Sequence, residues 1–365
     1  MKLAFLINTP AQVHFWRNII KILESRGHRV DVLARDYGEA IPLFKEYFNS
    51  YFVHSKKSDG PYKKIINFPF DMIRAYKYLN AVRPEIILGY GIDSAYISRF
   101  LRKPCIIFND SEPLNNTFFY SQHFKLFLRF VDAYISPDTF KNDFGIKHIK
   151  IRSFKEMAYL HPKYFNPDKS VLDYLGIGDN KFVLLRFNAF DALHDIGQWG
   201  FSNENKTKLV KELEKYCRVF ISSENKLPAE LEPYRIKIPL HKIHDVLFYA
   251  DLLVGDTQTL TTEAGILGTP AIRCNSFVGE KDMGNFIALE KDYGLIFNYN
   301  NPEKAIEKAI ELIQISNLKK DWSIKKEKLL KETIDVTGFM VWFIENYPAS
   351  FSKVQENTRL IDRFI

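Results

Sequence analysis

Short apolar runs alternate with longer amphipathic stretches along most of the 365-residue chain. The first run, LAFLIN, is followed by a polar segment, TPAQVH, that we expect to form a loop. In the next segment, FWRNIIKILESRGH, apolar residues recur at helical spacing, and Gly27 ends the predicted helix. VDVLAR then predicts a second strand. A strand, a helix and a strand in this order form a βαβ unit, which implies a parallel sheet with a right-handed crossover.

The same alternation continues to about residue 165. Buried strands are predicted by EIILGYG and PCIIFND, and helices by FDMIRAYKYLNAVRP and DSAYISRFLRK. LFLRFVDAYISPD predicts a helix followed by a short strand. We therefore expect residues 1–165 to form one Rossmann-like α/β domain, to which the resemblance described below assigns the acceptor.

A second α/β domain is predicted at 166–345. The segment HPKYFNPDKSVLDYLGIGDNK has no sustained period and predicts the boundary. Strands are then predicted by KFVLLRF, CRVFISS, DLLVGD and PAIRC, with helices between them and in NPEKAIEKAIELI. The fold class is thus α/β, with two doubly wound domains facing across a cleft, where ligands usually bind. Residues 346–365 are expected to be a tail that returns to the first domain.

Composition narrows the possible partners. Hydrophobic residues make up 46% and charged residues 26%, as in globular proteins, and the net charge is +7. A basic balance favours anionic partners, but no run of like charge is long enough for a nucleic-acid-binding tail. FFYSQHFKLFLRF and LKKDWSIKKEKLLKET are candidates for peripheral membrane contact, with a core-facing helix and a solvated helix as the plainer alternatives.

Cysteine usage and the N-terminus bear on location. Cys105, Cys217 and Cys274 form no Cys-x-x-Cys pair, which argues against a disulfide framework or a zinc site and favours a reducing compartment. The apolar N-terminal run is too short for a signal peptide, and no stretch has the length of a membrane span. We expect a cytoplasmic protein, with peripheral association at the inner face of the membrane as the alternative.

The stretch GDTQTLTTEAGILGTPAIR, residues 255–273, predicts an anion site. It follows a strand and opens a helix, where backbone amides and the helix dipole attract negative charge. The candidate ligands of a nucleoside diphosphate are Gly255, Asp256, Thr257, Gln258, Thr259 and Thr261. Glu263 stands too near a phosphate site to bind phosphate and is predicted to accept from ribose hydroxyls. The alternative is a threonine-capped helix whose first-turn acid favours the dipole.

Further candidates follow other predicted strands. His14 lies in the polar segment after the first strand and could act as a general base near neutral pH. Asp93 and Glu112 follow two later strands and could bind acceptor hydroxyls or act as acid and base, with loop caps as the alternative.

Three positions of the second domain complete the candidate set. Arg186 and Asn188 end its first strand and could face phosphate. Glu280 lies in a glycine-bounded loop suited to reading a sugar. His194 and Asp195 follow downstream.

Two similar α/β domains, a Gly-Asp-Thr-Gln-Thr at a strand-to-helix junction and Thr-Glu-Ala-x-x-x-Gly-Thr-Pro together resemble the GT-B superfamily. The pattern is similar to an uncharacterised GT-B-like domain family, to the non-hydrolysing UDP-N-acetylglucosamine 2-epimerases and to the N-acetylglucosaminyltransferase that forms lipid II. The resemblance covers roughly residues 1–345. It implies diphosphate binding at the helix start after Gly255, ribose binding by Glu263 and a place for His14 near the reacting sugar.

The chain also departs from the epimerase pattern. Those enzymes have Ser-Gly-Gly where Asp256, Thr257 and Gln258 stand, and His-Arg-x-Glu-Asn in place of the segment from Arg186 to Asn188. Their Thr-Glu-Arg-Pro-Glu is replaced after Arg273. These differences weaken the epimerase interpretation.

The resemblance therefore implies a metal-independent GT-B glycosyltransferase that moves a sugar from a nucleoside-diphosphate sugar, expected to be a UDP-sugar, to an acceptor hydroxyl in surface-glycan or glycolipid synthesis. No cofactor besides the donor is expected. His14 is the first choice for the base, followed by Asp93 or Glu112. A UDP-sugar 2-epimerase and a non-catalytic nucleotide-sugar-binding protein are the alternatives.

Overall fold

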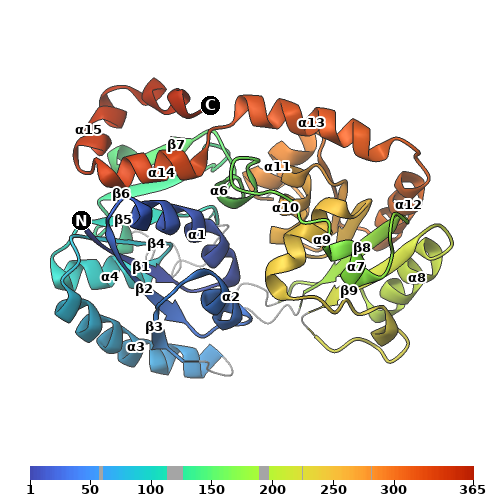
Figure 1. The fold of residues 1–365 in the computed structure, drawn as a ribbon, viewed down its shortest axis with the longest axis horizontal. Coiled ribbons are helices and arrows are strands. Elements are labelled where there is room, and N and C mark those ends of the chain that lie inside the picture. The colour runs from blue at the N-terminus through green and yellow to red at the C-terminus, as the bar shows by residue number, and fades with distance from the viewer. Residues whose placement is uncertain (57–60, 113–125, 189–196, 224, 281) are drawn as a thin grey trace. The chain divides into compact units, whose positions relative to one another are not determined.

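The computed structural model describes residues 1–56, 61–112, 126–188, 197–223, 225–280 and 282–365 (Figure 1). The chain divides into two compact units. The first unit comprises Met1–Tyr164 and Thr333–Ile365, and the second comprises Phe165–Glu332. Residues 333–345, which the sequence analysis grouped with the second domain, belong to the first unit.

A seven-stranded parallel sheet forms the centre of the first unit, in the order β3-β2-β1-β4-β5-β6-β7. Its strands are β1 (Lys2–Ile7), β2 (Arg29–Arg35), β3 (Phe52–Ser55), β4 (Ile86–Gly89), β5 (Cys105–Phe108), β6 (Ala133–Pro137) and β7 (His148–Ile151). β3 and β7, which the apolar pattern did not predict, form the two edges of the sheet.

Helices cover both faces of this sheet. They are α1 (Pro10–Ser25), α2 (Ala40–Tyr47), α3 (Pro61–Val82), α4 (Ile92–Leu101), α6 (Met157–Leu160), α14 (Val336–Glu345) and α15 (Ala349–Glu356). α1 packs with α2, α6 and α14, whereas α3 packs with α4. On the α3 and α4 side, Ala4, Leu6 and Ile87 of the sheet pack against Ala75 and Leu79 of α3.

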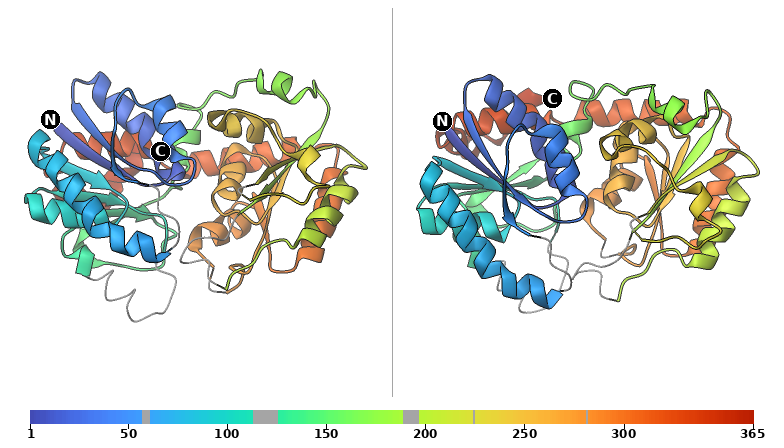
Figure 2. Two further views of the ribbon diagram at one scale, coloured as in Figure 1. Left: turned by 90° about the horizontal axis from the view of Figure 1, so that it is seen from below. Right: turned by 60° about the horizontal axis from the view of Figure 1, so that its bottom comes forward.

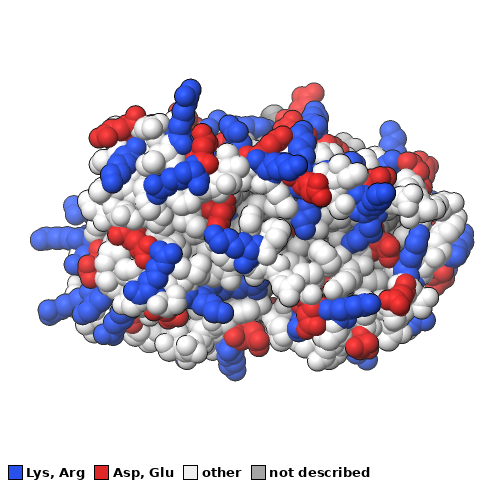
Figure 3. Space-filling model, turned by 45° about the horizontal axis from the view of Figure 1, so that its top comes forward, with Lys and Arg blue, Asp and Glu red and all other residues white. Residues whose placement is uncertain are grey.

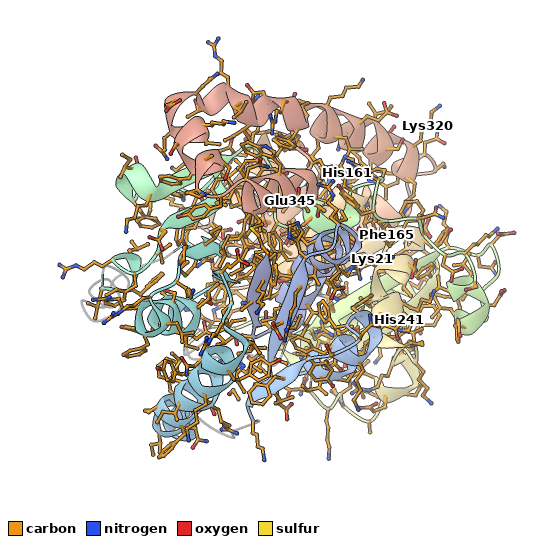
Figure 4. The ribbon with its side chains drawn as sticks, turned by 60° about the vertical axis from the view of Figure 1, so that its left-hand side comes forward. Lys21, His161, Phe165, His241, Lys320 and Glu345 are labelled. Atoms are coloured by element: carbon orange, nitrogen blue, oxygen red, sulfur yellow. The ribbon has the colours of Figure 1, made fainter. Side chains whose placement is uncertain are left out.

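The C-terminal segment is held to the first unit by charge as well as by packing. Glu345, at the end of α14, lies beside α1 (Figure 4). Its carboxylate accepts from Arg26 Nη1 at 2.6 Å and contacts His28 Nε2 at 3.1 Å. In addition, Thr337 Oγ1 donates to the carbonyl of Ala158 at 2.7 Å.

The expectation that His14 lies in a loop is wrong. α1 begins at Pro10, so His14 is within its second turn and is only 5% exposed. Thr9 is the N-cap residue, and its side chain accepts from the Gln12 amide. A threonine N-cap followed by proline at the first helical position is a strong start signal, and it outweighs the polar character of the segment.

The second unit contains a five-stranded parallel sheet in the order β12-β11-β10-β8-β9. Its strands are β8 (Phe182–Phe187), β9 (Arg218–Ser223), β10 (Leu252–Gly255), β11 (Ala271–Cys274) and β12 (Ile296–Tyr299). The helices are α7 (Val171–Leu175), α8 (Asn203–Leu213), α9 (Ile243–Tyr249), α10 (Thr259–Leu267), α11 (Gly284–Lys291), α12 (Pro302–Ile313) and α13 (Leu318–Glu332). Two parallel sheets with packed helices confirm the predicted α/β class (Figure 2).

Each sheet has one point at which the strand order reverses. In the first unit the chain builds outward from β1 to β3 and then returns to add β4 on the other side of β1. In the second unit the reversal lies between β8 and β10. In open parallel sheets, ligands bind outside the carboxyl ends of the strands at this reversal. The two reversal points therefore locate one candidate binding site in each unit.

The predicted membrane-contact segment LKKDWSIKKEKLLKET forms α13, and much of its basic character is used internally. Lys319 is half-buried and donates to the carbonyls of Phe248 and Ala250 at 2.6 and 2.8 Å. Lys325 donates to the Gly294 carbonyl at 2.9 Å. Most of FFYSQHFKLFLRF lies outside the described residues. Among the helices that the structure describes, none has both the length and the apolarity to cross a bilayer.

Candidate functional site

In the second unit, the backbones of β8 and β10 approach each other closely where the two strands end. Gly255 ends β10 and pairs with Arg186 of β8. A Cβ added at Gly255 would lie 2.3 Å from the Arg186 carbonyl oxygen. Only glycine fits this position, so the strand end is fixed as a narrow backbone platform ahead of α10.

The start of α10 offers backbone donors at this platform. The first backbone hydrogen bond of this helix runs from the Thr262 amide to the Gln258 carbonyl at 3.2 Å. The amides of Thr259, Leu260 and Thr261 precede it, and the first amides of a helix have no acceptor within the helix. Gln258 and Thr259 are partly exposed. An anion at this point would be bound by amides and by the helix dipole.

The threonine hydroxyls do not add to this donor set in the way the sequence suggested. Thr261 is fully buried, and its Oγ1 donates to the Thr257 carbonyl at 2.7 Å. Thr262 Oγ1 donates to the Gln258 carbonyl at 3.4 Å. Threonine inside a helix commonly bonds the carbonyl four residues back. The backbone amides of the first turn and the partly exposed Thr259 therefore remain as the candidate donors.

Asp256 organises the loops around the platform. Its Oδ1 accepts from the Asn188 amide at 2.7 Å, and its Oδ2 accepts from the Phe201 amide at 3.2 Å. Asn275 Nδ2 in turn donates to the Asp256 carbonyl at 2.9 Å. Burial raises the pKa of the Asp256 carboxyl to about 6, and the two amide donors oppose that rise. The side chain thus ties loop backbones together and does not point outward.

Glu263, the predicted ribose ligand, lies in the interior of the second unit. It is 3% exposed, and its Oε1 lies 2.9 Å from Nε2 of His244 on α9. The sequence analysis did not single out His244, which stands 19 residues before Glu263. The signal that could have identified His244 is its place in the predicted apolar helix HDVLFYA. The structure shows that this helix, α9, packs against α10.

The other predicted ligands of the second unit are distributed around β8 and β11. Arg186 Nη1 donates to Ser222 Oγ on the neighbouring strand β9 at 2.7 Å. Asn188 contributes its backbone amide to Asp256. Glu280 is exposed in the loop after β11. His194 and Asp195 lie outside the described residues.

Arg273 is a buried cation that the sequence analysis used only as a motif landmark. Its side chain is fully buried, forms an ion pair with Asp282 and donates from Nε to Asn298 Oδ1 at 2.8 Å. Its guanidinium carbon lies 3.6 Å from the centre of the Phe286 ring. Burial lowers the pKa of Arg273, and Asp282 opposes the change. These contacts fix the loop that carries Glu280 against β11.

In the first unit, the reversal point is bridged by a side-chain hydrogen bond. Asn8 follows β1, Asp93 follows β4, and Asn8 Nδ2 donates to Asp93 Oδ2 at 2.7 Å. The Asp93 carboxylate also accepts from the Ser94 amide at 2.9 Å, and the Asn8 amide donates to Gln12 Oε1 at 2.7 Å. The predicted residue Asp93 is thereby held in one orientation at the carboxyl edge.

His14 is enclosed by aromatic rings and an arginine. The imidazole stacks on Tyr159 of α6 at 5.5 Å and meets Tyr47 of α2 edge-on at 5.7 Å. Arg17, one turn further along α1, lies over Tyr47 at 4.5 Å and bonds His14 Nδ1 at 3.1 Å. Because a guanidinium can only donate, Nδ1 accepts, and the proton of the neutral ring is on Nε2.

Glu112 follows β5, the next strand beyond β4. Its Oε1 accepts from the Lys141 amide at 2.9 Å, which joins it to the segment after β6. Beside it in the sequence, Asp110 forms an ion pair with Lys155 at 2.7 Å, and Lys155 also lies 3.4 Å from Glu156. The sequence analysis missed Lys155 and Glu156, because they follow the short strand β7 that it did not predict.

Two more buried groups lie near these acids. His54 lies in β3, one residue before its end, and is 3% exposed; burial lowers its pKa, and the negative charge of Asp93 opposes that change. Tyr90 follows β4, and burial raises its pKa well above the usual value, with Asp110 and Glu156 adding to the rise. The carboxyl edge of the first sheet is therefore rich in acceptors and acids.

The structure brings the predicted catalytic residues to one edge, since His14, Asp93 and Glu112 follow β1, β4 and β5, which are neighbours in the sheet. In the second unit it groups the residues from Gly255 to Thr259 with Arg186 and Asn188. In the part of the chain that the structure describes, no three His, Cys, Asp or Glu side chains gather as a metal site.

Comparisons with known proteins agree with this architecture. The family described as "Protein of unknown function (DUF354)" matches residues 3–341. The uncharacterized protein MJ0665 of Methanocaldococcus jannaschii is 23% identical over 280 residues, which cover 74% of this chain and 80% of that protein.

Solved structures share the fold at low sequence identity. S. aureus MnaA, solved with UDP, has a TM-score of 0.68 at 12% identity, over 96% of this chain and 97% of its own. The M. jannaschii UDP-GlcNAc 2-epimerase, in complex with UDP-GlcNAc and UDP, has a TM-score of 0.60 at 13% identity, over 87% and 94%. The Streptomyces sp. SF2575 glycosyltransferase SsfS6, complexed with thymidine diphosphate, has a TM-score of 0.60 at 13% identity, over 94% of this chain and 99% of its own. The chain belongs to the family described as protein of unknown function (DUF354), and its fold is GT-B-like.

Proposed function

We propose that this protein is a glycosyltransferase that uses a nucleoside-diphosphate sugar, with UDP as the expected nucleotide. The donor diphosphate would bind at the start of α10. The observation that carries the proposal is the start of α10, where the amides of Thr259 and Leu260 precede the first backbone hydrogen bond of the helix, at the reversal point between β8 and β10. Structures with the same fold were solved with UDP or thymidine diphosphate bound, which supports a nucleotide as the ligand.

The chemistry follows from that placement. The acceptor oxygen forms a bond to the sugar anomeric carbon, and the bond from that carbon to the diphosphate oxygen breaks. The electron pair leaves with the diphosphate, whose developing charge the helix amides stabilise in the role that a divalent cation has in other enzymes. The acceptor proton must pass to a base.

We assign the base to Asp93 in preference to His14. The Asp93 carboxylate is oriented by Asn8 and Ser94 and is an acceptor. In His14, Nδ1 accepts from Arg17, so the proton of the neutral ring is on Nε2 and this nitrogen is a donor and not a base. Glu112 is the reserve candidate on the neighbouring strand.

The test places a charge at the proposed phosphate site. Thr259→Asp puts a carboxylate at the first position of α10, where the helix dipole stabilises it, so the ligand-free protein should unfold at an unchanged or higher temperature. The same charge repels a diphosphate. We expect the affinity for UDP, measured by calorimetry, to fall at least about tenfold, or ~1.4 kcal/mol. Thr259→Asn is the matched neutral control and should bind UDP nearly as wild type does. If wild type, Thr259→Asp and Thr259→Asn bind UDP with equal affinity, the diphosphate does not bind at the start of α10.

Incubation with UDP-N-acetylglucosamine alone separates the related activities. A 2-epimerase converts this substrate without an acceptor, whereas a transferase requires one. A protein that binds UDP but turns over no donor with any acceptor would be a binding protein, and that result would contradict the proposed transfer.

A further inference from the structure

The outward face of α3 is apolar where a solvated helix is normally polar. Ile66, Phe70 and Ile73 are spaced four and three residues apart, so they lie on one face of the helix. Their exposed fractions are 64%, 63% and 52%. Ala75 and Leu79, on the opposite face, are fully buried against the sheet. The core of the first unit is therefore complete without the three exposed side chains.

Figures 1 and 2 show α3 along the outside of the first unit. A single exposed apolar side chain needs no explanation, but an aligned set of three on one helix marks an interaction surface. The surface is the convex side of one helix and is not a groove. It therefore suits a flat, deformable surface better than a protein segment that binds in a groove.

The charge around this face is positive. Among the side chains of α3 that the structure describes, Arg74 and Lys77 stand against the single acid Asp71. Asp71 accepts from Ser55 Oγ and from Arg74 Nη2, both at 2.6 Å. Lys77 is exposed and follows Ile73 by one turn, on the same face.

The whole first unit shares this bias. It contains 28 Lys and Arg against 19 Asp and Glu, whereas the second unit contains 23 against 25. The first unit, which carries α3, therefore has a net charge of +9, the second unit has −2, and together they give the +7 of the whole chain. In contrast, the face in Figure 3 shows basic and acidic side chains interspersed.

We propose that α3 docks the protein on an anionic lipid bilayer, with Ile66, Phe70 and Ile73 inserted at the level of the lipid headgroups and Lys77 on lipid phosphates. An amphipathic helix with aromatic and aliphatic side chains on one side and lysines beside them lies in the plane of the interface. Each lysine near an anionic surface adds to binding, and salt screens that contribution. The proposal does not depend on the reaction that the protein catalyses.

Co-sedimentation of the full chain with vesicles tests this surface. We expect binding to vesicles of phosphatidylcholine mixed with phosphatidylglycerol, weaker binding to phosphatidylcholine alone, and release at high salt. The double variant Phe70→Ser with Ile73→Ser should reduce the partition coefficient at least about tenfold, because two apolar side chains no longer insert. Its melting temperature should be unchanged, since both side chains are exposed.

Two further variants sharpen the result. Lys77→Glu should weaken binding to the mixed vesicles and leave binding to phosphatidylcholine as it was. Ile324→Ser, at a 60% exposed position of α13, is the matched apolar control and should bind as wild type does. The proposal is overturned if wild type does not bind the mixed vesicles or if the double variant binds equally well. A wild-type dimer that the double variant converts to a monomer, seen by light scattering, would assign the face to a second copy and also overturn it.

Discussion

The Arg17 guanidinium donates to Nδ1 of His14 at 3.1 Å, one turn apart on α1. This contact decides which chemistry the histidine offers, because an accepting Nδ1 leaves the proton of the neutral ring on Nε2. A histidine that looks like a base in the sequence is held as a hydrogen-bond donor. The Tyr47 and Tyr159 rings restrict its rotation.

If His14 donates, the conservative variant should rescue function. We expect His14→Ala to lower kcat/KM about a hundredfold, as removal of a donor to a developing charge does. His14→Gln, whose amide also donates, should recover part of that loss. Nitrogen NMR of the wild type should show the Nε2-protonated form, and Arg17→Met should shift the ring toward a mixture of tautomers. Equal activity of the Ala and Gln variants would argue against donation.

Gly255, in the candidate site of the second unit, has no room for a Cβ beside the Arg186 carbonyl oxygen. Gly255→Ala should destabilise the protein by about 1–3 kcal/mol, since overpacking against a backbone carbonyl forces the two strands apart. The measurement is chemical unfolding followed by circular dichroism. Gly279→Ala is the control, because a Cβ there meets nothing within 4 Å. A Gly255→Ala protein as stable as this control would show that the β8 and β10 ends can move apart freely.

Substitution of Glu263 should act on stability as well as on binding. Glu263→Ala removes the carboxylate from buried His244 and should lower the free energy of unfolding by about 1–3 kcal/mol. The double variant Glu263→Ala with His244→Ala should lose less than the sum of the two single changes. If Glu263→Ala weakens UDP binding and leaves the unfolding curve in place, the ribose role predicted from the sequence is supported instead.

Acid should destabilise the first unit through His148. Its side chain is 1% exposed, and burial, with Lys150 adding to the effect, lowers its pKa from 6.5 to about 4. A depressed histidine pKa means that the unfolded chain binds the proton first. The stability is therefore complete above pH 6.5 and is lost as the pH falls toward 4, by up to about 3 kcal/mol. Hydrogen exchange in β6 and β7 peptides, corrected for the intrinsic rate, measures the change.

Asp256 has the opposite dependence and provides the control within the same molecule. Its pKa is raised from 3.8 to about 6, so the folded second unit holds this proton more tightly than the unfolded chain does. Its contribution is complete below pH 3.8 and is lost as the pH rises through 6. Protection around β10 should therefore not fall with that of β6 and β7 between pH 6.5 and 4. A parallel loss in both units would point to global acid unfolding and not to His148.

Local patterns in the sequence were sufficient for the α/β class and for most strands. In a strand, residues two apart share a face, and in a helix, residues three or four apart do so, whatever the rest of the chain does. The spacing of apolar residues therefore identifies strands and helices directly. The glycine and threonine cluster from Gly255 to Thr259 was likewise identifiable, because a strand end followed by a helix start has local signals. β3, β7 and β12 were missed, because these edge strands are only partly buried and have no continuous apolar run, unlike the equally short β4 and β5.

What each side chain does was decided by tertiary structure. The sequence placed Glu263 and the Thr261 hydroxyl near a ligand, but helix packing turned them toward His244 and the Thr257 carbonyl. The Asn8 to Asp93 bond joins residues 85 positions apart and exists only because β1 and β4 are neighbours in the sheet. Sequence periodicity specifies which face of an element is buried. Which distant partner lies against that face depends on strand order, and strand order is a property of the whole folded unit.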